Sequence, residues 1–177
     1  IAFSPDGKIL ASGNRHCIIR VFEIDTGRDL LRLTGHDSPQ KALLTREILG
    51  DVRIQFIRRS DRFVSHAVSG KHHVLKLWDT EAGESLLTIK GTRGAVDGSP
   101  VIAFATDSRG AKLLAGTKEF GLYDVETGKQ LRTFAGHDAK VGGRVIGKYP
   151  ITRLALSESH THAASWVQAD TMKVWDA

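Results

Sequence analysis

Cysteine is nearly absent from this chain of 177 residues, which contains only Cys17. A single thiol cannot form an internal disulfide, so the chain has no disulfide framework, and an intracellular, cytoplasmic protein is favoured. No apolar run approaches the roughly 20 residues that a membrane-spanning helix requires, and no signal-like segment opens the chain. We therefore expect a soluble protein with no membrane partner.

Clusters of basic residues are also missing, although the formal net charge is +5. Lysine and arginine are spread along the chain, and the densest group is Arg58-Arg59 with Arg62 nearby. A nucleic-acid-binding face normally gathers its basic residues on one side. The sequence therefore predicts a solvated, mildly basic surface and no nucleic-acid partner.

The sequence contains none of the common catalytic motifs. It has no Gly-x-Ser-x-Gly elbow, no glycine loop ending in Lys-Ser or Lys-Thr, and no His-Glu-x-x-His. His160 and His162 would share one face of a strand, but no second cluster of metal ligands lies at a suitable spacing. We expect these histidines, like His72 and His73, on the surface or in loops. The prediction is a non-enzyme with no catalytic residues, no metal and no cofactor.

What the chain does contain is a repeating frame. Residues 71–80, KHHVLKLWDT, predict a strand with Leu75 and Leu77 on one face and Lys76 and Trp78 on the other. Glycines follow Trp78 after five and thirteen residues, and the same spacing follows Phe22 and Tyr123. A fourth copy ends at residues 175–176, Trp-Asp. Such a period indicates a repeat architecture.

Each copy predicts four short strands joined by turns, which is an antiparallel meander. The predicted strands are 1–3, 9–13, 18–22 and 30–33; 52–57, 63–68, 74–78 and 86–89; 101–105, 112–116, 120–123 and 131–134; and 151–156, 162–166 and 172–175. The fourth copy has no fourth strand. Acidic residues recur at equivalent turns, namely Glu23, Asp79, Asp124 and Asp176. Because an active site needs one set of groups rather than four, these residues are expected to form turns.

Two connections between copies are longer than the third. Within the first, Lys41 to Leu49 places Leu44 and Ile48 at helical spacing and predicts a short helix. Within the second, Ala139 to Tyr149 holds three glycines and is predicted to be irregular.

These features resemble the WD-repeat β-propeller family over nearly the whole chain. The resemblance is carried by FSPDGKILASG (3–13), LKLWDTEAG (75–83), YDVETGKQLRTFAGH (123–137) and MKVWDA (172–177), and by the Gly-His pairs at 35–36 and 136–137. It implies an all-β fold of β-propeller blades, each a four-stranded antiparallel meander, around a central channel. About four blades are expected, near 1–34, 35–90, 91–135 and 136–177, with the last incomplete. Each meander has apolar residues on both faces, so neighbouring blades must cover it.

The family often ties a blade together with a hydrogen-bonded set of histidine, serine or threonine, aspartate and tryptophan. In the fourth copy, the resemblance implies that this set is His137, Ser165, Asp170 and Trp175. Asp170 lies one residue closer to the tryptophan than the family pattern has it. In the second copy, the implied members are His36 and Trp78, while His72 falls at the aspartate position.

The resemblance further implies a non-enzymatic scaffold that binds a protein or peptide partner through loops on its top face. We expect the connections 37–52 and 138–150 to form the recognition surface, because they leave the same edge as the Gly-His pairs. The residues expected to contact the partner are Arg46, Glu47, Arg53, Lys140, Arg144, Lys148 and Tyr149.

Several alternatives remain open at this stage. The chain is also compatible with a regulatory or sensor propeller that contacts a catalytic domain of its own longer chain, or with a propeller enzyme of the quinoprotein type. The long connections are also compatible with tolerated insertions of no function. Since propellers of this family usually have about seven blades, we expect further blades from a parent chain, or self-association, to cover the open faces and edges.

Overall fold

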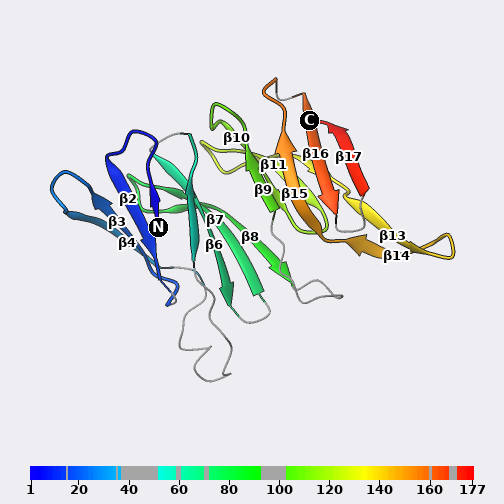
Figure 1. The fold of residues 1–177 in the computed structure, drawn as a ribbon, viewed down its shortest axis with the longest axis horizontal. Coiled ribbons are helices and arrows are strands. Elements are labelled where there is room, and N and C mark those ends of the chain that lie inside the picture. Colours follow the sequence, from blue (N-terminus) through cyan, green and yellow to red (C-terminus); the bar gives the residue numbers. More distant parts are fainter. Residues whose placement is uncertain are drawn as a thin grey trace. The chain divides into compact units, whose positions relative to one another are not determined.

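The computed structural model of the protein describes residues 1–14, 16–34, 36, 52–58, 61–69, 72–92, 103–159, 161–167 and 171–177. Within these residues every regular element is a β-strand (Figure 1). The strands form successive antiparallel meanders, three with four strands and one with three, and one separate hairpin. The predicted fold class is therefore confirmed. The helix expected within 41–49 lies outside the described residues.

The first half of the chain, Ile1–Lys90, is a compact unit with two sheets. The first sheet contains β1 (Ala2–Phe3), β2 (Ile9–Gly13), β3 (Ile19–Glu23) and β4 (Asp29–Leu33). The second sheet contains β5 (Arg53–Phe56), β6 (Arg62–Ser69), β7 (His72–Asp79) and β8 (Ser85–Thr92). In both sheets the spatial order of the strands equals their order in the chain.

The second half, Gly91–Ala177, is a separate compact unit. Its third sheet contains β9 (Ala103–Thr106), β10 (Lys112–Gly116), β11 (Phe120–Asp124) and β12 (Gln130–Phe134). A hairpin of β13 (His137–Val141) and β14 (Arg144–Tyr149) follows. The fourth sheet contains β15 (Ile151–Leu156), β16 (His162–Val167) and β17 (Thr171–Asp176).

The glycine of the repeated frame lies in the turn after the third strand of each complete meander. In each such turn a glycine of positive φ donates its backbone N–H to the carbonyl oxygen of the acidic residue that ends the third strand. The pairs are Gly27 with Glu23, Gly83 with Asp79, and Gly128 with Asp124. The acidic side chains support the same turns, since Oδ1 of Asp79 accepts the backbone N–H groups of Glu81 and Ala82. The repeated acidic residues of these three meanders therefore act in turns, as their repetition predicted.

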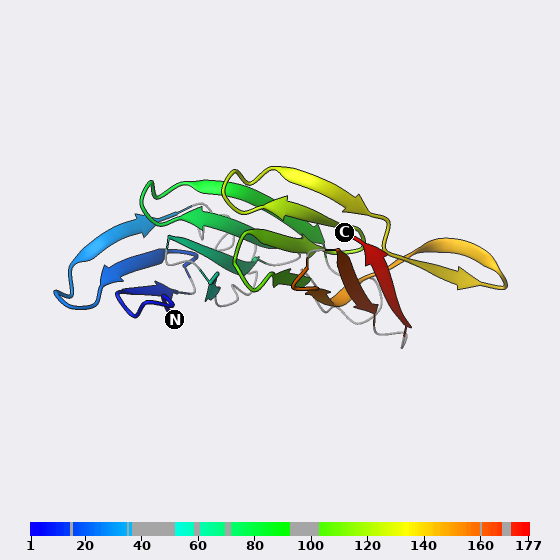
Figure 2. The same ribbon diagram turned by 90° about the horizontal axis from the view of Figure 1, so that it is seen from above.

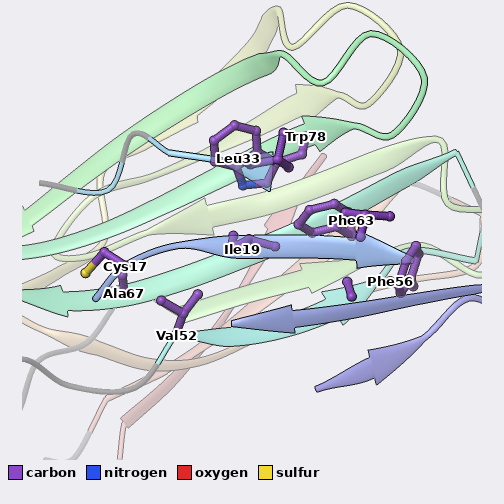
Figure 3. Close-up of a cluster of buried hydrophobic side chains, with 10 residues drawn as sticks. Cys17, Ile19, Leu33, Val52, Phe56, Phe63, Ala67 and Trp78 are labelled. Carbon is purple, nitrogen blue, oxygen red and sulfur yellow. The ribbon is translucent and has the colours of Figure 1, made fainter. Parts of the chain in front are cut away.

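The core of the first unit lies between the first and second sheets (Figure 3). It combines one apolar face of each sheet, and its members are Ala11, Cys17, Ile19, Val21, Leu33, Val52, Phe56, Phe63, Ala67 and Trp78. Phe56, Phe63 and Trp78 stand opposite one another on β5, β6 and β7, and their ring centroids are 5.5 and 6.3 Å apart. Burying each such side chain contributes about 1.5–3 kcal/mol, so this row holds the two sheets together.

The core of the second unit repeats this arrangement between the third and fourth sheets. Phe120 and Phe134 stack at 4.6 Å, and the Trp175 ring meets both edge-on at 5.8 and 6.0 Å. Leu114 and Ile151, each 0% exposed, fill the space beside these rings. In both units a tryptophan of one sheet therefore packs on the apolar face of the sheet before it.

The prediction that residues 139–149 are irregular is wrong. Strands β13 and β14 pair antiparallel from His137 opposite Tyr149 to Val141 opposite Arg144, with a bulge after Ala139. The turn is Gly142-Gly143, whose φ angles of 56° and 80° are both left-handed. Two such residues form the turn that matches the twist of a hairpin. In Figure 2 this hairpin extends beyond β15–β17.

Candidate functional site

His36, Ser65 and Trp78 form a buried hydrogen-bonded group in the first unit. The indole Nε1–H of Trp78 donates to Ser65 Oγ at 2.7 Å, and His36 Nε2 lies 2.6 Å from the same oxygen. The His36 and Trp78 rings meet edge-on at 6.2 Å. This group ties the segment that follows the first sheet to β6 and β7 of the second sheet.

The second unit contains the same group, made of His137, Ser165 and Trp175. Trp175 Nε1–H donates to Ser165 Oγ at 2.8 Å, and His137 Nε2 is also 2.8 Å from that oxygen. Lys173 Nζ donates to the backbone oxygen of Gly136 at 3.1 Å and so holds the start of the hairpin. Burial lowers the pKa of His137, and the nearby Lys173 ammonium lowers it further. The imidazole is therefore neutral at pH 7.

These two serine–histidine pairs are inaccessible to a substrate. Ser65 and Ser165 are 0% and 1% exposed, and each Oγ already accepts an indole N–H. A nucleophilic serine must reach its substrate through an open site. The pairs therefore stabilise the sheets and position His36 and the start of the β13–β14 hairpin.

The structure brings together His36 with Trp78, and His137 with Ser165 and Trp175. Asp170 lies outside the described residues, and so does the side chain of His72. The sequence reasoning missed Ser65, which occupies the position of Ser165: both serines pair with the lysine two residues before the tryptophan. Serine and tryptophan are 13 residues apart in the second sheet and 10 in the fourth. Because the β6–β7 hairpin is longer, residue spacing alone does not show that Ser65 is equivalent to Ser165.

The β13–β14 hairpin presents an apolar tip to solvent. Val141, Val145 and Ile146 are 65%, 51% and 65% exposed. Of the residues predicted to contact a partner, Lys140 and Arg144 lie beside this tip, and both are exposed. Three side chains of large apolar area, flanked by two cations, are an unusual combination for a surface with no binding role.

The base of the hairpin is fixed rather than free. Lys148 forms an ion pair with Glu119, which precedes β11. Tyr149 is half-buried and packs against the core of the second unit. Ile151 donates its backbone N–H to the carbonyl of Thr117 at 2.7 Å. Lys148 and Tyr149 therefore hold the hairpin, while the tip beyond them remains exposed.

The remaining predicted contact residues lie in the first long connection or directly after it. Arg46 and Glu47 lie outside the described residues. Arg53 is exposed on β5, where it stands opposite His66.

A pair of histidines lies on β6 and β7. His73 Nδ1 is 3.3 Å from His66 Nε2, and His73 is 1% exposed. The expectation that His73 lies on the surface or in a loop is therefore wrong, because His73 is a buried residue of β7. Burial lowers the pKa of His66, the nearby His73 and Arg53 add to this effect, and together they bring it to about 4. His66 is therefore neutral at pH 7.

The described residues contain no group of three or more His, Cys, Asp or Glu side chains arranged to hold a metal ion. The same part of the chain includes no helix of the length and apolar character needed to cross a membrane.

No protein-family model matches the chain. An uncharacterized WD repeat-containing protein of Nostoc sp. is 50% identical over 38 residues, which are 22% of this chain and 2% of that protein. A nuclear distribution protein PAC1 of Arthroderma benhamiae is 30% identical over 123 residues, which are 65% of this chain and 24% of that protein. The chain thus spans about a quarter or less of the length of these relatives.

Solved structures match more of the chain. The computationally designed Ika8 protein aligns with a TM-score of 0.61 and 25% identity, over 99% of this chain and 44% of that protein. The designed Ika4 protein aligns with a TM-score of 0.57 and 24% identity, over 96% of this chain and 85% of that protein. The chain therefore shows similarity to WD repeat-containing proteins that is either short or of low identity, and an all-β fold of successive antiparallel meanders.

Proposed function

We propose that the chain is a portion of an intracellular WD-repeat β-propeller that serves as a non-enzymatic scaffold for protein binding. Its blades are about 1–34, 35–90, 91–135 and 136–177. The similarity to WD repeat-containing proteins supports this assignment, as do the two histidine–serine–tryptophan groups and the sheet-on-sheet cores. A rigid set of blades is a suitable base for exposed binding segments.

The observation that carries the binding role is the β13–β14 hairpin. Its base is fixed by the Lys148–Glu119 ion pair, while its tip exposes Val141, Val145 and Ile146. A segment ordered in advance loses little entropy when it binds. Its open strand edges also offer backbone groups to an added strand.

The hairpin also indicates the chemistry of its partner. Residues 137–149 contain three cationic side chains and one carboxylate. We therefore propose a peptide segment with apolar anchors for the tip and acidic residues facing Lys140 and Arg144. Charge complementarity of this kind mainly raises the association rate and the specificity.

The test uses a displayed library of random peptides, selected on the full 177-residue chain. The hairpin variant Val141→Ser/Val145→Ser/Ile146→Ser removes the apolar tip. The control is Leu131→Ser, which removes a 48% exposed leucine from β12. Selected peptides should bind the hairpin variant at least tenfold more weakly than the control and should be rich in Asp and Glu. Peptides that bind both variants equally well would contradict the proposal.

A further inference from the structure

The β13–β14 hairpin forms a sheet of its own, and its two outer edges differ. Among the described residues, each of its strands pairs only with the other. The ladder pairs Ala139 with Gly147 and Lys140 with Val145. Ile146 is therefore an extra residue in β14, which contains a β-bulge, whereas β13 has none.

The bulge makes the outer edge of β14 a poor template for another strand. A bulge bends its strand, increases the local twist and interrupts the even series of backbone groups along the edge. The base of β14 is also occupied, since Lys148 is paired with Glu119 and Tyr149 packs against the core. On β13 the stretch 138–141 is regular, and it is exposed except at the half-buried Ala139. The usable edge of the hairpin is therefore that of β13.

The side chains of β13 determine which strand fits this edge. Lys140 and Val141 point to opposite faces of the hairpin, because side chains alternate along a strand. Lys140 stands opposite Val145 rather than an acidic residue, and Val141 is 65% exposed. Opposite charges on directly opposed residues stabilise a strand pair, and like charges destabilise it. The β13 edge therefore favours an acidic residue beside Lys140, flanked by apolar residues that meet Ala139 and Val141.

We propose that the peptide partner of the hairpin binds as an added strand along the outer edge of β13, with an acidic residue beside Lys140. This inference rests on the peptide-binding role proposed above and specifies its geometry. In such a complex the backbone hydrogen bonds supply the attraction, and the alternating side chains select the peptide. The hairpin is ordered before binding, because the Lys148–Glu119 ion pair fixes its base. The peptide alone therefore loses conformational freedom.

Lys140 also makes this edge selective. An exposed, regular edge attracts strands of many sequences, and a lysine is one of the devices by which natural sheets oppose such pairing. A basic residue beside Lys140 is repelled and an acidic one is attracted. The same cation therefore discriminates against strands of the wrong charge.

The test uses a synthetic peptide as the probe, fluorescein-Ser-Thr-Val-Glu-Val-Thr-Ser-amide. Its central residues have the expected pattern and read the same in both directions, so the probe fits the edge in parallel or antiparallel orientation. Binding to the full 177-residue chain is measured by fluorescence anisotropy. Because the exposed edge is short, we expect a weak and reversible complex. A probe that does not bind would overturn the inference, while the proposed function would still be judged by the library selection.

N-methylated forms of the probe test whether the peptide binds as a strand. Along a strand, the N–H groups point alternately to the neighbouring strand and away from it. Methylation of either the glutamate nitrogen or the two valine nitrogens should therefore weaken binding about tenfold, as the loss of one hydrogen bond does. Methylation of the other set should have little effect. Equal effects at all of these positions would overturn the inference but not the peptide-binding role of the hairpin.

A charge reversal tests which edge is used. Lys140→Glu should weaken binding of the probe about tenfold, and a probe with lysine in place of glutamate should restore it. Arg144→Glu is the matched control, since Arg144 is exposed beside the tip but belongs to β14. It should change neither affinity by more than about twofold. Circular dichroism melting verifies that both variants are folded, which we expect because both side chains are exposed.

Two results of the charge reversal would overturn the inference. One is a Lys140→Glu variant that binds the original probe like wild type. The other is rescue by the lysine probe in Arg144→Glu instead of Lys140→Glu, which would place the peptide on the β14 edge.

Discussion

The buried serine of the second sheet provides a direct measure of what the histidine–serine–tryptophan group contributes. Ser65 is 0% exposed, and its Oγ bonds both Trp78 Nε1 and His36 Nε2. Ser65→Ala removes one oxygen and leaves both nitrogens without that partner. A buried polar group that loses its hydrogen bond costs about 1–3 kcal/mol. We therefore expect Ser65→Ala to lower the free energy of unfolding of the first unit by about 2–4 kcal/mol.

The first sheet supplies a matched control. Ser12 stands opposite Arg20, just as Ser65 stands opposite Lys76, but the third-strand ring beside it belongs to Phe22 and has no N–H donor. Ser12→Ala should therefore change the free energy of unfolding by no more than about 0.5 kcal/mol, as surface substitutions do. The contrast between the two variants isolates the hydrogen bonds from the general effect of replacing serine in a second strand.

The assay is urea unfolding followed by far-ultraviolet circular dichroism, for Ser65→Ala, Trp78→Phe and the double variant. Because the two residues share a hydrogen bond, the double variant should cost about 1 kcal/mol less than the sum of the single ones. Additive single effects, or a Ser65→Ala cost equal to that of Ser12→Ala, would show that the bonds do not stabilise the fold.

Two further predictions concern the pH dependence of stability and the substitution of two glycines. Because the pKa of His66 is about 4 when folded and 6.5 when unfolded, the unfolded chain binds more protons below pH 6.5. Stability should therefore fall from pH 6.5 to 4 by up to about 3 kcal/mol, and His66→Gln should remove that slope while the exposed His16→Gln control keeps it. A Cβ at Gly136 would lie 1.9 Å from the backbone oxygen of Lys118, whereas one at Gly143 meets nothing within 4 Å. Gly136→Ala should thus cost several kcal/mol in thermal unfolding and Gly143→Ala about 1 kcal/mol; equal costs would contradict the clash.

The repeated frame made the sheets predictable because its residues act locally. An aromatic residue, an acidic residue and a glycine within six positions specify the end of a strand and the turn after it. Leu75 and Leu77 are both 0% exposed and Trp78 is 3% exposed, in agreement with the predicted alternation. A strand covered on both faces must carry such a pattern.

Features that depend on register across strands were harder to find. Ser65 was missed because the β6–β7 hairpin is longer than the β16–β17 hairpin. The extra residues increase the separation of Ser65 from Trp78 in the sequence, but the two residues keep the same cross-strand positions as Ser165 and Trp175. In the third sheet Thr106 lines up with Leu113 and Tyr123, whereas Phe3 and Phe56 occupy the equivalent positions of the first two sheets. A fixed count of residues cannot account for hairpins of different length.

The hairpin at 137–149 was missed for a different reason. Its glycines suggested an irregular segment, yet Gly142-Gly143 flanked by Val141 and Arg144 is itself a hairpin signal. The exposed tip also has no buried face, so the sequence of β13 and β14 shows no alternation of apolar and polar residues that would predict strands. The secondary-structure propensity of these residues did not predict an ordered hairpin. The hairpin is fixed at its base by the Lys148–Glu119 ion pair, which joins residues far apart in the sequence.

The strand order has a consequence for synthesis of the protein. Each described sheet pairs strands that are consecutive in the chain, so a meander can form as soon as its last strand leaves the ribosome. The sheet that covers its apolar face is synthesised later. A nascent chain that ends near residue 34 has all four strands of the first sheet, but Ile19 and Val21 remain exposed to solvent until Phe63 and Trp78 have been synthesised. During that interval we expect the first sheet to bind chaperones, because its apolar face is exposed.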